Sequence, residues 1–98
     1  MSLISFLNDL FKEDGFELVD SNSKKYVIGN PKKEKPIIIK LLDQKLMQKL
    51  LINPDLYFGE AYTDGEIVIE NGSLTDFLDL SLMNFGRGEL NFFSYLIN

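Results

Sequence analysis

GEAYTDGEIVIENGSL, residues 59–74, contains the densest run of local structure signals in the chain. Apolar and polar side chains alternate through its second half, and the β-branched residues there predict a strand over 66–70. Asn71-Gly72 then predicts a turn, because both residue types accept a positive φ at low steric cost. Ser73 predicts a helix N-cap, and Asp76 stands where it would complete a capping box.

The first half of this stretch is polar but lies between apolar flanks. Gly59 and Gly65 enclose Glu60, Tyr62 and Asp64. Such a segment is either a tight packing joint or a binding site. As a site, these five residues would contact another domain or a ligand such as a lipid headgroup. As a joint, the carboxylates would satisfy nearby backbone amides and the tyrosine ring would pack with its hydroxyl bonded.

Working outward, apolar runs separated by turn residues predict the other elements. Ser2 predicts the cap of a first helix, Asp43 the cap of a second, and Pro54 the first residue of a third. The uninterrupted apolar run 37–42 predicts a central strand covered on both faces. The predicted helices span 3–11, 43–51, 73–84 and 89–97, and residues 55–62 are expected to form a short helix or a turn. The predicted strands span 16–20, 25–28, 37–42 and 66–70.

This order of elements predicts an α+β fold. We expect an antiparallel-rich sheet of about four or five strands, with the first three as antiparallel neighbours and helices on one face. Residues 1–85 are expected to form a single domain. Residues 86–98 are expected to be a linker, hinged at Gly86-Arg87-Gly88, that carries the last helix. The apolar surface of that helix indicates a partner or a continuation of the chain.

The composition narrows the classes of function. A chain of 98 residues has room for one modest core. The net charge of −5 argues against general nucleic-acid binding, which needs a positive field. The sequence has no histidine and no cysteine, so it lacks the commonest general base, thiolate metal ligands and a cysteine nucleophile. We therefore expect no metal site, no catalytic residues and a cytoplasmic location.

Several short motifs occur in a fixed order between about Phe16 and Asn84. They are Tyr26-Val27-Ile28-Gly29, the strand 37–41, Asn53-Pro54-Asp55, Gly59-Glu60-Ala61-Tyr62, Asp64-Gly65, Ile67-Val68-Ile69 and Gly72-Ser73-Leu74. Together they resemble the N-terminal region of the cyclopropane-fatty-acyl-phospholipid synthases. The order of elements also resembles the sterol-carrier-protein type of lipid-binding fold.

The resemblance implies a role in phospholipid modification. Enzymes of that family transfer a methylene carbon from S-adenosylmethionine to the double bond of an unsaturated acyl chain in a membrane phospholipid. The strand and glycine-rich loop of a methyltransferase domain are not recognisable here, because Gly86-Arg87-Gly88 follows a predicted helix. The resemblance therefore implies an N-terminal accessory domain that has no cofactor itself. S-adenosylmethionine would bind to a methyltransferase domain of the parent protein, to which residues 86–98 would lead.

Two functions are compatible with this interpretation. The first is a non-catalytic module, peripheral at the inner membrane face, that engages lipid and presents it to the methyltransferase domain. The second is a structural module that docks to that domain or forms a homodimer without binding lipid. A headgroup-facing patch would favour the first, since each lysine near an anionic membrane contributes up to about 1 kcal/mol. The alternative role is a solvated loop that protects a sheet edge. The candidate lysines are Lys24, Lys25, Lys32, Lys33 and Lys35.

Overall fold

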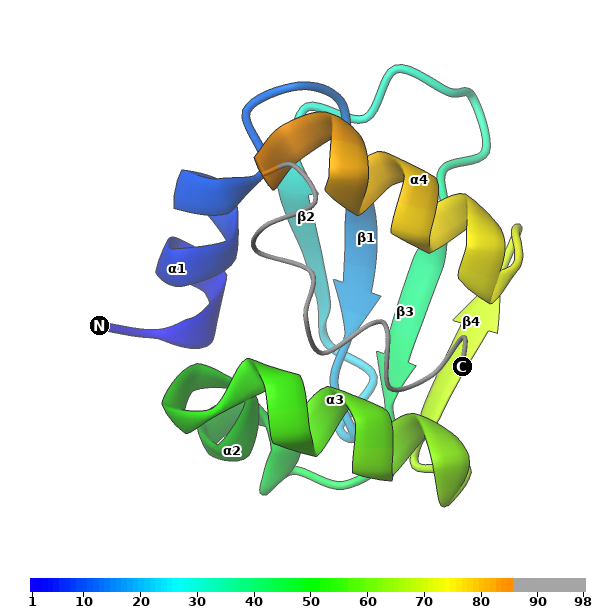
Figure 1. Ribbon diagram of the computed structural model, residues 1–98. Helices are drawn as coiled ribbons and strands as arrows, with labels where there is room; N and C mark the ends of the chain where they lie inside the picture. Colours follow the sequence, from blue (N-terminus) through cyan, green and yellow to red (C-terminus); the bar gives the residue numbers. More distant parts are fainter. Residues whose placement is uncertain (86–98) are drawn as a thin grey trace.

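The computed structural model describes residues 1–85, so the predicted helix over 89–97 lies outside the described residues (Figure 1). Within that range the class is α+β, as predicted. Most elements lie within a few residues of their predicted positions. They are α1 (Leu3–Leu10), β1 (Gly15–Val19), β2 (Lys25–Gly29), β3 (Ile38–Leu41), α2 (Leu46–Ile52), α3 (Pro54–Thr63), β4 (Ile67–Glu70) and α4 (Leu74–Phe85).

The four strands form one mixed sheet in the order β2-β1-β3-β4. β1 pairs antiparallel with β2 and parallel with β3, and β3 pairs antiparallel with β4. The predicted antiparallel arrangement of the first three strands is therefore wrong. The loop after β2 passes the start of β1, where the Asp14 carbonyl accepts from Asn30 N–H at 3.1 Å and its carboxylate from Lys32 N–H at 2.9 Å. The loop thus crosses one end of β1 and places β3 on the side of β1 opposite to β2.

One face of the sheet is buried and the other is open within the described residues. Phe16, Leu18, Ile39 and their register partners point toward the helices and are buried or half-buried. Val27 is 55 % exposed on the other face. β3 is an interior strand, as predicted, but it is not covered on both faces, because Ile38 and Lys40 are only half-buried.

The helices lie on the buried face of the sheet. Figure 1 shows α1, α3 and α4 arranged around that face, and α2 packs against both α1 and α3. The Phe77 ring of α4 lies at the centre of the core. Its centroid is 5.1 Å from that of Phe16 on β1, 5.8 Å from that of Phe58 on α3 and 6.2 Å from that of Phe11. Aromatic packing thus joins both ends of the described chain to the sheet.

Side-chain caps fix where three helices begin. The Ser2 hydroxyl accepts from Ser5 N–H, and the Asn53 side chain accepts from Leu56 N–H. At α4, Ser73 N–H donates to the Asp76 carboxylate at 2.8 Å, and Asp76 N–H donates to the Ser73 hydroxyl at 3.1 Å. This is the predicted capping box.

The second predicted helix begins later than expected. Asp43 was expected to cap it, but its carboxylate accepts from Lys45 N–H at 2.9 Å within a turn. α2 begins at Leu46 without a side-chain cap. Because an aspartate bonds an amide two residues on as readily as one three residues on, the residue type alone does not separate a turn from a cap.

Candidate functional site

An apolar groove lies on the buried side of the sheet. Its volume is ≈ 340 Å³. Strands β1, β3 and β4 and helices α1, α3 and α4 supply most of its lining residues, and α2 contributes Leu50. The described residues that line it are Leu3, Phe6, Leu7, Leu10, Phe11, Phe16, Leu18, Ile39, Leu41, Leu50, Pro54, Phe58, Ile67, Phe77, Ser81 and Phe85.

The chemistry of this groove suits an apolar guest. Ser81 supplies the one polar side chain among the described lining residues, and its hydroxyl donates to the Phe77 carbonyl at 2.9 Å. A polar ligand group placed there would lose its hydrogen bonds to water without replacement, which costs several kcal/mol per group. A hydrocarbon chain has no hydrogen bonds to water to lose, and its burial is favourable by about 0.8 kcal/mol of free energy per CH₂.

The walls of the groove are incompletely covered by the described residues. α1 carries apolar side chains at helical spacing, yet Leu3 is its one fully buried residue. Phe6, Leu7 and Leu10 are half-buried, as is Phe85 at the end of α4. The Phe85 ring contacts Phe11 edge-on with centroids 5.4 Å apart. Apolar surface on two facing helices is therefore left available to an additional group.

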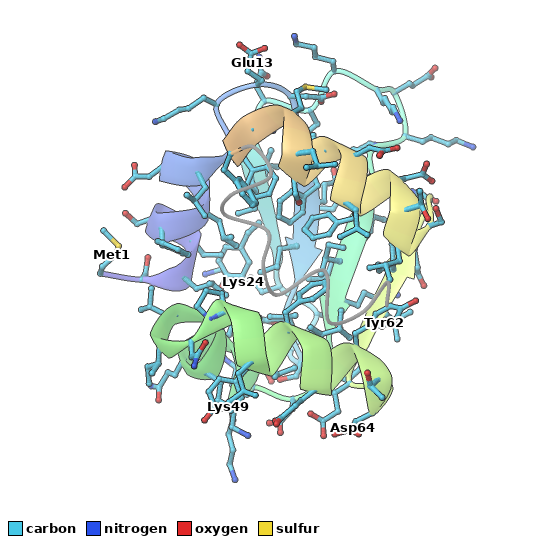
Figure 2. All side chains as sticks on the ribbon, viewed as in Figure 1. Met1, Glu13, Lys24, Lys49, Tyr62 and Asp64 are labelled. Atoms are coloured by element: carbon cyan, nitrogen blue, oxygen red, sulfur yellow. The ribbon has the colours of Figure 1, made fainter. Side chains whose placement is uncertain are left out.

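The polar set of residues 59–65 does not converge on one site. Glu60 and Asp64 are exposed, whereas Gly59 is buried in α3. The Tyr62 ring is half-buried and lies parallel to the Phe58 ring, with centroids 6.4 Å apart. Figure 2 shows Tyr62 and Asp64 on opposite sides of α3. The ring contact with Phe58 is compatible with either alternative, so both the joint and the contact of this set with another domain or ligand stay predictions.

Gly65 has a clear backbone role. Its φ of +77° lies in the left-handed region and allows the chain to turn from α3 into β4. The preceding α3 ends at Thr63, and the backbone N–H of its C-cap residue Asp64 donates to the Glu60 carbonyl. Gly65, at the C-terminal end of residues 59–65, therefore sets the direction in which the chain leaves α3.

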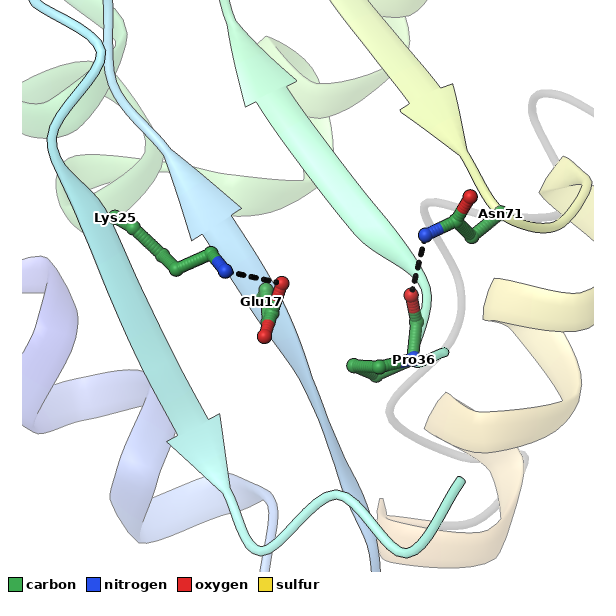
Figure 3. Close-up of polar contacts among 4 residues, drawn as sticks. All are labelled: Glu17, Lys25, Pro36 and Asn71. Carbon is green, nitrogen blue, oxygen red and sulfur yellow. Dashed lines mark hydrogen bonds and ion pairs between the residues drawn. The ribbon is translucent and has the colours of Figure 1, made fainter. Parts of the chain in front are cut away.

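The five candidate lysines lie in two separate groups. Lys24 and Lys25 are at the start of β2, where the Lys24 ammonium lies 5.1 Å from the Tyr26 ring centroid and Lys25 pairs with Glu17 at 3.1 Å (Figure 3). Lys32, Lys33 and Lys35 are in the loop after the end of β2. A five-residue strand separates the groups by roughly 16 Å. Headgroup binding by all five together would need a surface that spans this distance.

The groove itself was not predicted. The sequence pattern places its lining residues on helix and strand faces, and nothing in a periodic pattern distinguishes a residue that fills the core from one that lines a cavity. The signal available was composition, since 8 of the 98 residues are phenylalanine. Six of these come from distant parts of the chain to the same cavity: Phe6, Phe11, Phe16, Phe58, Phe77 and Phe85.

Residues 1–85 contain no cluster of three or more acidic, histidine or cysteine side chains able to hold a metal ion. None of the helices described is both long enough and apolar enough to cross a bilayer. No family model matches the sequence, and no curated protein matches it. The geometry and chemistry of the groove are therefore the basis for assigning a function.

Proposed function

We propose that this protein is a non-catalytic lipid-binding domain that holds one acyl chain in the groove between α1, α3 and α4. The observation that supports this is the cavity of ≈ 340 Å³ with an apolar described lining. Small-molecule sites commonly have volumes of about 300–1,000 Å³ and apolar walls. A single hydrocarbon chain matches both the size and the chemistry of this one.

The absence of acidic and basic side chains from the described lining favours binding over chemistry. Nucleophilic or general acid–base catalysis requires titratable side chains within hydrogen-bond reach of the reacting atoms. The described lining offers only the Ser81 hydroxyl, which is already bonded to a backbone carbonyl. A methylene transfer to a bound acyl chain would therefore be carried out by another domain.

The sequence resemblance to the cyclopropane-fatty-acyl-phospholipid synthases supports a specific role for such binding. We propose that the domain engages an acyl chain of a membrane phospholipid and presents it to an S-adenosylmethionine-dependent methyltransferase domain of the same parent protein. The domain would then act at the membrane surface as a peripheral module. The alternative role is that of a structural module that docks to that domain or forms a homodimer without binding lipid.

Binding of a fluorescent fatty acid to the full chain tests the groove. Leu7→Lys places a charge on the half-buried wall of α1, and we expect it to weaken the affinity for the probe at least tenfold because the ammonium would have to be desolvated. Val27→Lys is the matched control, since it makes the same type of change on the open face of the sheet. Unchanged circular dichroism must accompany both. Equal affinities in the two variants, or no saturable binding to the unmodified chain, would refute the proposal.

Vesicle flotation tests the membrane role separately. We expect salt-sensitive binding to vesicles that contain an anionic phospholipid, because screening weakens attraction between exposed charges. Replacement of all candidate lysines by glutamine should abolish it. No binding to vesicles of any charge would remove the membrane role while leaving acyl-chain binding in solution intact. The variant replaces Lys24, Lys25, Lys32, Lys33 and Lys35.

A further inference from the structure

The volume of the groove limits the length of hydrocarbon chain that it can hold. That volume is ≈ 340 Å³. Apolar cavities of about 150 Å³ hold one benzene molecule, which corresponds to about 25 Å³ per carbon atom. A water molecule in the liquid, which is close in size to a methylene group, takes up about 30 Å³. On these two measures the groove has room for roughly 11–14 carbon atoms.

The described lining favours burial of every methylene group that fits. It contains no acidic or basic side chain, and its one hydroxyl, that of Ser81, already donates to the Phe77 carbonyl at 2.9 Å. Each CH₂ that enters should therefore raise the affinity roughly fourfold. A carbon atom that lies beyond the filled groove stays in water and adds far less.

The polar end of a lipid has no partner in the described part of the groove. A carboxylate or phosphate placed among these side chains would lose its hydrogen bonds to water without replacement. The polar end therefore stays outside, and only the apolar chain enters. A chain longer than roughly 14 carbons then leaves part of its hydrocarbon outside the groove as well.

We propose that the groove binds a segment of roughly 11–14 carbons of an acyl chain and that the rest of a longer chain remains outside it. This inference rests on the proposed function, to which it adds the length of chain that is held. The bound segment lies against α1, α3 and α4. The part left outside is the part that another domain can reach.

Competition between fatty acids and a fluorescent fatty acid on the full chain tests this limit. The competitors are octanoate, decanoate, dodecanoate, tetradecanoate, hexadecanoate and octadecanoate, each below its critical micelle concentration. We expect the affinity to rise roughly fifteenfold for each added pair of carbons as far as dodecanoate or tetradecanoate. From there to octadecanoate it should change little, because the additional carbons stay in water.

The result also separates this inference from lipid binding as such. An affinity that still rises steeply beyond tetradecanoate, or that levels off before dodecanoate, would overturn the limit while acyl-chain binding stands. No saturable binding of the fluorescent probe and no competition by any acid would instead remove the proposed function, and the inference with it.

A variant of the groove wall tests whether the volume of the groove sets the limit. Leu10 is half-buried on α1 and lines the groove, so Leu10→Ala makes space for about three more carbon atoms. We expect its affinity to keep rising for at least one further acid in the series. Val27→Ala is the matched control, because Val27 lies on the open face of the sheet and is 55 % exposed.

Circular dichroism checks that both variants fold. If Leu10→Ala folds and levels off at the same acid as the unmodified chain, the groove volume does not set the limit and the proposal is overturned. If Leu10→Ala does not fold, the series measured on the unmodified chain decides the question.

Discussion

Replacing Gly29 by alanine should destabilise the fold far more than the same change at Gly65. Both residues have a left-handed φ, +69° at Gly29 and +77° at Gly65, so both substitutions incur roughly 1–2 kcal/mol of backbone strain. A Cβ on Gly29 would lie 2.5 Å from the Asp14 carbonyl oxygen and 2.8 Å from that of Phe11. A Cβ on Gly65 meets nothing within 4 Å among the described residues.

The two clashing atoms at Gly29 belong to backbone, so relief requires the end of α1 and the start of β1 to move. Overpacking of this kind costs about 1–3 kcal/mol in addition to the strain. We therefore expect the free energy of unfolding to fall by about 2–5 kcal/mol in Gly29→Ala and by about 1–2 kcal/mol in Gly65→Ala. For comparison, the total free energy of unfolding of a small domain is only about 5–15 kcal/mol.

Urea unfolding followed by tyrosine fluorescence measures both losses, since the chain has four tyrosines and no tryptophan. The midpoint should fall for each variant while the slope m stays constant, so that the change reports stability alone. A loss at Gly29 equal to that at Gly65 would refute the reasoning. It would show that strain at positive φ decides the cost and that the contact between α1, β1 and β2 yields easily.

Two further predictions concern polar contacts at the ends of α4. The pKa of Asp76 lies below its usual value of 3.8, chiefly because its carboxylate accepts a hydrogen bond from the Ser73 N–H. The Ser73 hydroxyl and the positive charge of Lys33 lower this pKa further, and burial opposes them slightly. The cap therefore stabilises the native state above that value and is lost as the pH falls through the lowered pKa, so Asp76→Asn should flatten the acid limb of a plot of melting temperature against pH. Asn84 accepts from Glu13 N–H at 2.7 Å and donates to the Glu13 carbonyl at 2.8 Å, so Asn84→Ala should cost about 1–3 kcal/mol in urea unfolding. An unchanged midpoint would show that water replaces both bonds.

Local signals in the sequence were sufficient for most of the secondary structure. The caps at Ser2, Asn53 and Ser73 depend on contacts within three residues, and such contacts are specified by the sequence at that point. The alternation at 66–70 likewise predicts the buried Ile67 and the exposed Val68 correctly.

Features that depend on distant residues could not be predicted in this way. The parallel pairing of β1 with β3 follows from a loop that is hydrogen-bonded to Asp14. The residue types in the loop do not predict that hydrogen bond. The open face at Ile38 is the result of all described helices covering the other side of the sheet. The groove arises from the spacing of α1, α3 and α4, which is set by packing across the whole domain.

The bond between Glu13 and Asn84, which joins residues 71 positions apart, has a consequence for the nascent chain. Ribosomes add about 5–20 residues per second, so α1 and β1 are synthesised roughly 4–14 seconds before the end of α4 exists to meet them. During that interval the rings of Phe11 and Phe16 have no access to Phe77, their partner in the finished core. A stalled product that ended before α4 would therefore display an aromatic surface, and we expect it to be a preferred client of ribosome-associated chaperones.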